Sequence, residues 1–332
     1  MKRIDLHSHV IPETIIKAMR EQPTVYNTQI EGEGEALVFK RGKVTFDLIP
    51  EFYSAEAKLE SMDRKGLTMS VISPGPQSFF YNLKDADLAL TTARLVNDGV
   101  AEMARHKPDR LRGMATLPMQ HPDAAIAELE RVVKEHGFKG VEIGTAIGEE
   151  ELSDPKFRPV LRRIEELKVV IFAHPNTQGS GGRLDCYYLT NLIGNPLDTT
   201  VMVGKLMFSG ALDELPDLKM LLAHGGGFLP YQIGRFEHGH KVRPDTAAAT
   251  RSSPLDMFRR FYFDALTHDP LAIRHLIDRV GSDRVVIGTD SPFDMGEEQP
   301  VERLDAVPRL TQKEREDVCY RSATQLFGDG LL

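Results

Sequence analysis

The sequence predicts an α/β fold, a (β/α)₈ TIM barrel with a small β-hairpin insertion near the N-terminus, and three observations favour it. Short, almost continuously apolar segments alternate with longer amphipathic ones along most of the 332 residues. Such apolar segments are typical of parallel strands that are covered by helices on both faces. Eight of them can be counted, the number that closes such a barrel, and metal-binding residue types stand where several of them end. We therefore expect a single domain over residues 1–332.

The expected strands and helices alternate in chain order. The first strand covers Ile4–His9, and a short helix follows over Glu13–Arg20. Further strands are expected at residues 69–73, 111–117, 140–143, 169–174, 219–224, 261–264 and 284–290. Amphipathic helices are expected at residues 55–65, 85–106, 123–136, 155–166, 199–212 and 271–280. A last helix after Pro308 would pack on the outside of the barrel.

One segment, at about residues 20–52, breaks this alternation. Two short strands, Ala36–Phe39 and Val44–Phe46, flank the turn Lys40-Arg41-Gly42-Lys43, in which a glycine favours a tight hairpin. We expect this hairpin to cover the mouth of the barrel. On sequence alone, a surface ribbon without a function is an equally good interpretation.

Composition excludes several classes of function. A net charge of −8 argues against a nucleic-acid-binding protein, which needs a basic face. No apolar run approaches the roughly 20 residues that a membrane span needs. Cys186 and Cys319 are too few for a disulfide framework, and the chain opens directly into a strand without a signal segment. These features predict a cytoplasmic protein.

His7 and His9 lie two residues apart on the first strand. Alternate side chains of a strand point to the same face, so the two imidazoles are expected side by side, where they suit a divalent transition metal. The alternative is one structural histidine in the core and one on the surface. Three later strand ends carry further ligand types and favour the metal.

His174, His224 and Asp290 each end an expected strand. Active sites of these barrels lie at the carboxyl ends of the strands, so these side chains should meet His7 and His9 at one mouth. Three histidines and one carboxylate leave the open position that a catalytic metal needs. Zn²⁺ is the first candidate for one divalent ion, and Mn²⁺, Co²⁺ or Fe²⁺ also suit these ligands. His224 could then take a proton from metal-bound water.

The stretch Gln178–Arg183 is rich in glycine but lacks the G-K-[ST] ending of a phosphate-binding loop. We expect a flexible loop beside the active site, and a plain connector is the alternative.

Seven motifs spread over the chain resemble those of the amidohydrolase superfamily, and within it the branch of the 2-amino-3-carboxymuconate-6-semialdehyde decarboxylases. They are IDLHSH (4–9), GMATLPMQ (113–120), GFKGVEIGT (137–145), FAHP (172–175), AHGGG (223–227), DALTHDP (264–270) and GTDSPF (288–293). The resemblance implies that His7, His9, His174 and Asp290 bind the metal. It also implies that His224, together with Asp290, is catalytic.

The same resemblance implies arginines that hold the substrate carboxylates, one from the insertion and one lent across a homodimer interface. Arg235 matches the second, whereas Phe46 and Asp47 stand where the first would be, with Lys40 nearby. Asn191 stands near the place of a family tryptophan that this chain lacks. The candidate substrate-binding residues are therefore Arg235, Lys40, Phe46, Asp47, Asn191 and Phe293.

The function favoured is a metal-dependent non-oxidative decarboxylase. It would act on a small carboxylated aromatic acid or on a muconate semialdehyde-type ring-cleavage acid. A hydrolase of C–C, amide or lactone bonds, or a hydratase, would need the same five metal-site residues and is the alternative. A metal-storing barrel without catalysis is a third possibility, although storage needs no open metal position.

Overall fold

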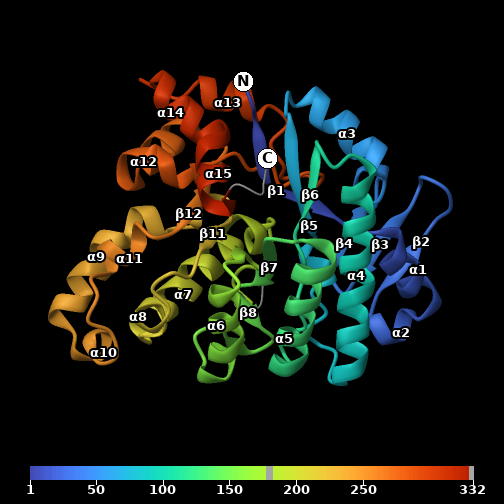
Figure 1. Cartoon of the computed structure of the whole chain (residues 1–332), viewed down its shortest axis with the longest axis horizontal. Coiled ribbons are helices and arrows are strands. Elements are labelled where there is room, and N and C mark those ends of the chain that lie inside the picture. Colours follow the sequence, from blue (N-terminus) through green and yellow to red (C-terminus); the bar gives the residue numbers. More distant parts are fainter. Residues whose placement is uncertain (177–181, 329–332) are drawn as a thin grey trace.

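A computed structural model describes residues 1–176 and 182–328, and the eight predicted barrel strands are all present (Figure 1). Gln178 and most of the glycine-rich stretch lie outside the described residues. The strands are β1 (Ile4–Val10), β5 (Met69–Pro74), β6 (Leu111–Gly113), β7 (Gly140–Gly144), β10 (Val170–His174), β11 (Met220–Leu222), β12 (Tyr262–Asp264) and β13 (Val285–Val286).

All neighbouring barrel strands run parallel, in two groups. One group has the order β1-β5-β6 and the other β13-β12-β11-β10-β7. Single parallel bridges join the groups on both sides, at Ala115↔Val141 and at Asp5↔Ile287 and Ser8↔Ser291. These bridges close the ring, and the predicted (β/α)₈ barrel is confirmed.

Two apolar layers hold the barrel. The inner layer fills the ring with Ile4, Leu6, Met69, Val71, Met114, Val170, Phe172, Leu221, Tyr262 and Val286, closed at one end by residues of the last helix. The outer layer packs the opposite faces of the strands against the surrounding helices. Because side chains alternate along a strand, most barrel strands are apolar on both faces, as their sequences suggested.

The helices surround the ring in Figure 1. Those between the strands are α3 (Ala55–Arg64), α4 (Ala86–His106), α5 (Pro122–Arg131), α6 (Arg158–Glu166), α7 (Asn195–Phe208), α8 (Ala211–Glu214) and α12 (Pro270–Val280). Helices α9 (Leu229–Val242), α10 (Pro244–Ala247) and α11 (Pro254–Phe258) lie between β11 and β12 and were not predicted. The chain ends with α13 (Pro300–Asp305), α14 (Gln312–Glu316) and α15 (Ser322–Phe327).

Three predicted elements end four residues earlier in the structure than expected. The helix expected at 199–212 begins at Asn195 and ends at Phe208, because Gly210 takes a left-handed conformation (φ 78°) that starts α8. The strand expected at 284–290 is regular only at Val285–Val286, and Asp290 has a positive φ of 57°. The strand expected at 111–117 is regular only to Gly113.

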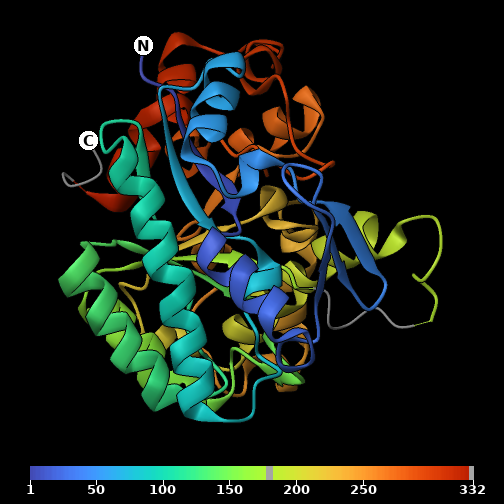
Figure 2. The same ribbon diagram turned by 90° about the vertical axis from the view of Figure 1, so that its right-hand side faces the viewer.

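The insertion follows α1 (Glu13–Glu21) and α2 (Pro23–Tyr26) and has one strand more than predicted. It is a three-stranded antiparallel sheet of β2 (Gln29–Glu31), β3 (Val38–Arg41) and β4 (Val44–Asp47), and the last two form the predicted hairpin. Its strands stand to one side of the barrel, beside the segment that begins at Gly182 (Figure 2). An ion pair of 3.3 Å between Lys43 and Asp185 joins the two segments.

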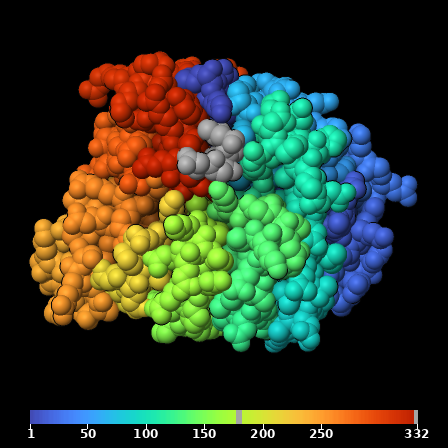
Figure 3. Space-filling model, viewed as in Figure 1, coloured from blue at the N-terminus to red at the C-terminus, as the bar shows by residue number. Residues whose placement is uncertain are grey.

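The N-terminal residues and the C-terminal helices lie together, at the end of the barrel that carries the amino termini of the strands. Figure 3 shows the N-terminal residues beside the C-terminal helices, and the Arg315 guanidinium lies 3.6 Å from the Met1 sulfur. Within the described part of the chain, no helix combines the length and apolar character that crossing a membrane requires.

Candidate active site

Four buried side chains converge at the carboxyl end of the barrel strands. His7 and His9 lie on β1, His174 ends β10, and Asp290 follows β13. One ligand atom of each lies within 4.8 Å of the others. The Nε2 atoms of His7 and His9 are 3.0 Å apart and lie 3.2 and 3.0 Å from Asp290 Oδ1. The sequence predicted this set, and the structure brings all four together.

The chemistry of this set fits one divalent metal ion. Neither His174 Nε2 nor Asp290 Oδ1 has a hydrogen-bond partner among the described residues, although both atoms are buried. The other ring nitrogen of His174, Nδ1, donates to the Pro175 carbonyl at 2.8 Å, so Nε2 carries the free lone pair. Buried lone pairs that point at one place need a cation to satisfy them. The four residues therefore form a site for one divalent ion.

Asp264, at the end of β12, contacts His7 on the side of the ring that faces away from the ligand cluster. Its Oδ2 accepts the Nδ1 proton of His7 at 2.6 Å, a contact that orients Nε2 toward the ligand cluster. Burial alone would raise the pKa of Asp264, but the hydrogen bond to His7 brings it below its ordinary value. Sequence reasoning missed this role. The available signal was a carboxylate at a strand end, in line with His174 and Asp290.

Asp264 also holds the loop that carries His224. Its carboxylate accepts hydrogen bonds from the backbone N–H groups of His224 (2.9 Å) and Gly225 (2.8 Å). His224 itself has a positive φ of 55°, and a turn of glycines follows it. A Cβ at Gly227 would lie 2.2 Å from the Pro196 carbonyl oxygen, so only glycine fits there. One carboxylate thus fixes both a metal ligand and the backbone of His224.

His224 faces the ligand cluster without belonging to it. Its Nε2 lies 3.6 Å from Asp290 Oδ2, and its ring centre is 5.2 Å from that of His7 and 5.1 Å from that of His174. Its side chain is 17% exposed, whereas those of His7 and His9 are fully buried. His224 therefore lies where a molecule bound next to the ion would touch it.

Aromatic side chains form one wall of the site. Phe293 lies with its ring 5.4 Å from that of His9, and Phe46 of the insertion packs against Phe293 at 5.6 Å. Phe52 packs against both rings, at 5.4 Å from Phe46 and 5.1 Å from Phe293. The insertion thus reaches the metal ligands through apolar rings, and both predicted phenylalanines, Phe46 and Phe293, lie at the site.

The structure does not bring the other insertion candidates to the ligands. Lys40 alternates with Phe39 on β3, points away from the aromatic wall, and forms an ion pair of 2.5 Å with Glu31. Asp47 alternates with Phe46 on β4 and is exposed. Asn191 is half-buried in a π-helical turn, Thr190–Gly194, beyond the described end of the glycine-rich stretch.

Arg41 is a residue of the insertion that sequence reasoning assigned only to a turn. It lies on the same face of β3 as Phe39, and burial lowers the pKa of its guanidinium to about 10. The guanidinium donates to Thr28 Oγ1 at 2.7 Å and to the Gln77 carbonyl at 2.6 Å, and it lies 4.8 Å from the Phe80 ring centre. These bonds tie the insertion to the loop after β5.

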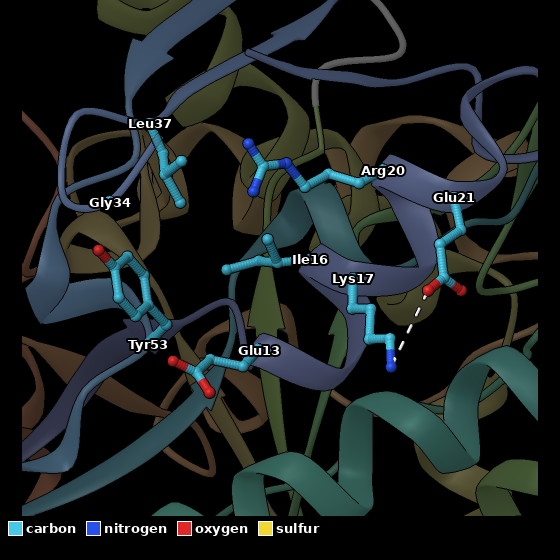
Figure 4. A pocket seen from close by; sticks show the side chains of 8 residues that line it. All are labelled: Glu13, Ile16, Lys17, Arg20, Glu21, Gly34, Leu37 and Tyr53. Carbon is cyan, nitrogen blue, oxygen red and sulfur yellow. Dashed lines mark ion pairs between the residues drawn. The ribbon is translucent and has the colours of Figure 1, made fainter. Parts of the chain in front are cut away.

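A separate hollow of about 400 Å³ lies between α1 and the insertion. Figure 4 shows Ile16, Leu37 and Tyr53 around it, with Lys17 paired to Glu21 at its edge. None of the metal ligands lines it. The candidate active site is the ligand cluster at the barrel mouth, and this hollow is separate from it.

Comparison with known proteins identifies the family of this chain. The sequence profile of the amidohydrolase family matches residues 4–328. The chain belongs to the amidohydrolase family. It is 30% identical over 329 residues to the 2-amino-3-carboxymuconate-6-semialdehyde decarboxylase of Dictyostelium discoideum, an alignment that covers 98% of this chain and 91% of that protein.

Two further comparisons are informative. The γ-resorcylate decarboxylase of a Rhizobium species is 31% identical over 258 residues, covering 72% of this chain and 77% of that protein. The crystal structure of a dihydroxybenzoic acid decarboxylase from a Polaromonas species, with bound manganese, superposes with a TM-score of 0.78 at 22% identity. That alignment covers 98% of this chain and 96% of the other.

Metal binding to this amidohydrolase site is expected to weaken as the pH falls. Burial alone would lower the pKa of His7, but the carboxylates of Asp290 and Asp264 raise it to about 10. Below that pH the ion must displace a proton from His7, so each unit of acidification should cost up to about tenfold in affinity. Competition titrations against a chelator between pH 6.5 and 8.5 would measure this slope. An affinity that stays constant, after correction for protonation of the chelator, would contradict it.

Proposed function

We propose that this protein is a metal-dependent non-oxidative decarboxylase that acts on a small carboxylated aromatic acid or on a muconate semialdehyde-type ring-cleavage acid. The observation that carries the proposal is the partly exposed His224 facing a buried cluster of three histidines and Asp290. This arrangement combines a place for an anionic substrate with a proton donor beside it. The aromatic wall of Phe46 and Phe293 suits a flat ring.

The divalent ion held by His7, His9, His174 and Asp290 would supply Lewis acidity, which binds anionic oxygens and stabilises negative charge. Protonated His224 would donate its proton to the substrate carbon that bears the carboxylate. The bond between that carbon and the carboxylate then breaks, its electron pair returns to the conjugated system, and CO₂ leaves. The wall of Phe46, Phe52 and Phe293 would orient the ring and exclude water.

Both curated relatives described above carry decarboxylase names, and this supports decarboxylation over hydrolysis or hydration. The test is to incubate metal-replete protein with carboxylated catechols, hydroxybenzoates and muconate semialdehydes while CO₂ and ultraviolet absorbance are followed together. Release of CO₂ in step with the spectral change is expected. A spectral change without CO₂ would favour the hydrolase or hydratase.

We propose zinc as the resident ion, because a set of three imidazoles and one carboxylate suits it well. Manganese is bound in the structure of the Polaromonas enzyme, so the two ions need direct comparison. Protein stripped of metal and reloaded with one ion at a time would show which restores activity. Higher activity with Mn²⁺ than with Zn²⁺ would overturn the zinc assignment.

We also propose that the protein is a homodimer in which each Arg235 completes the partner's site. Arg235 is exposed on α9, and its guanidinium forms no ion pair with any residue that the structure describes. Large apolar side chains are exposed on the same side, on α7 and at the start of α9, among them Val201 and Phe228. Tyr231, four residues before Arg235, is 83% exposed. Exposed apolar side chains on neighbouring helices are typical of protein interfaces.

A mixture of two impaired variants, assayed at a substrate concentration below the wild-type KM, tests this arrangement. Arg235→Ala should raise KM roughly ten- to a hundredfold, the worth of a hydrogen bond to a charged group, and His224→Ala should remove the proton donor. When subunits of the two variants exchange, each heterodimer has one intact site, so about a quarter of the wild-type activity should return at random mixing.

Arg162→Ala, which removes an exposed arginine of α6, is the matched control and should be active by itself. No recovery of activity in a mixture with verified subunit exchange would show that each subunit works alone.

A cytoplasmic location is proposed as well, supported by two free cysteines, Cys186 and Cys319.

A further inference from the structure

Glu142 lies in register with Phe172, an apolar residue of the inner layer of the barrel. Its neighbours on β7, Val141 and Ile143, belong to the outer apolar layer, so Glu142 points into the ring. The other barrel strands place residues such as Val71, Phe172 and Leu221 there. Glu142 is fully buried. A buried carboxylate is costly unless a positive charge or hydrogen-bond donors compensate it.

The group that faces the Glu142 carboxylate is the imidazole ring of His9, one of the proposed metal ligands. Its Oε2 is 3.5 Å from Nδ1 of His9, across a fully buried contact. In the part of the chain that the structure describes, neither oxygen of Glu142 has a hydrogen-bond donor, and His9 Nδ1 has no other acceptor. The carboxylate and the ring nitrogen therefore face only each other.

The same arrangement is found behind each ligand histidine. His7 Nδ1 donates to Asp264 at 2.6 Å, and His174 Nδ1 donates to the Pro175 carbonyl at 2.8 Å. An oxygen behind the ring fixes which nitrogen carries the proton and so which nitrogen faces the ion. For His9, the oxygen atom in this position is Oε2 of Glu142.

We propose that Glu142 is a positioning residue for the metal: its carboxylate holds the Nδ1 proton of His9, so that Nε2 faces the ion, and its negative charge strengthens cation binding. The inference rests on the metal site proposed above. Glu142 differs from Asp264 in one useful way. Asp264 also accepts bonds from the backbone of the His224 loop, whereas His9 supplies the one ion pair that Glu142 makes among the described residues. A change at Glu142 therefore isolates the effect on the ion.

Two variants separate the two parts of this role. Glu142→Gln keeps an oxygen that can accept the Nδ1 proton but removes the charge, and Glu142→Leu removes both. Removing such a partner typically weakens metal binding by about 10–100-fold, so the loss should be near the lower value for Glu142→Gln and the upper one for Glu142→Leu. Dissociation constants for Zn²⁺ and Mn²⁺ would be measured by competition with a chelator. The absorption spectrum of the Co²⁺-loaded protein would report any change in ligand geometry.

Glu128 offers a matched control, because it is a second fully buried glutamate and lies far from the ligands. Its carboxylate accepts hydrogen bonds of 2.7 Å from Asn97 and from Arg131. Glu128→Gln should lower Tm and leave metal affinity unchanged. For Glu142→Gln, the rise in Tm that saturating metal causes should shrink instead.

The outcomes separate this inference from the metal site itself. If Glu142→Gln and Glu142→Leu both bind metal within about twofold of the wild type, the positioning role is overturned while the metal site stands. If the wild type binds no divalent ion, the metal proposal fails first. Should Glu142→Leu not fold, as judged by circular dichroism, Glu142→Gln decides alone, and wild-type affinity in it would overturn the role.

Discussion

Alanine at both His7 and His9 is expected to abolish metal binding and activity while the barrel stays folded. The double variant removes two of four ligands, and the Nε2 atoms lost are the ones that lie 3.0 Å apart at the centre of the cluster. The remaining pair, His174 and Asp290, offers too few donors for a closed set around Zn²⁺. Metal analysis of the dialysed protein should find almost no ion, and circular dichroism should be unchanged.

A control double variant, His106→Ala with His275→Ala, removes two histidines of the helical surface. His106 lies on α4 and pairs with Glu56, and His275 is exposed on α12. This protein should keep its metal and its activity. Full metal content in the His7 and His9 variant would show that the ion is bound elsewhere.

His224→Ala should keep the ion and the fold and lower kcat by roughly 10²–10⁴-fold, the usual contribution of a general acid or base. The residue lies 3.6 Å from Asp290 and does not belong to the converging set of ligand atoms. Its removal therefore deletes a proton donor and leaves the four ligands in place. Metal content and kcat must be measured on the same sample. Joint loss of metal and activity would make His224 a ligand and would contradict the role proposed for it.

The metal ligands were predictable from sequence because two simple rules place them. A spacing of two puts His7 and His9 together on a strand, and the ends of parallel barrel strands meet at one mouth. The supporting carboxylates were not predictable in the same way. Glu142 lies inside an apolar strand segment, where nothing in the sequence says which face it takes. For Asp264, the sequence showed only a carboxylate at the end of an expected strand and gave no sign of its contact with His7.

The insertion shows a different limit. The strand Gln29–Glu31 has little apolar alternation and pairs through its backbone, so its sequence gives no signal of it. The hairpin was predicted, but its first strand extends to Arg41, two residues beyond the predicted end. That extension takes Lys40 out of the expected turn and places it in a strand, opposite Gln29 and ion-paired with Glu31.

The closure of the barrel has a consequence for how the protein is made. The bridges from Asp5 to Ile287 and from Ser8 to Ser291 join the first strand to the last, and the Thr289–Asp5 hydrogen bond spans 284 residues of sequence. The histidines of β1 lie on one side of this junction and Asp290 on the other. During synthesis the ligand set therefore does not exist until nearly the whole chain has left the ribosome. A divalent ion would bind only after the barrel has closed, and it would stabilise only the closed barrel.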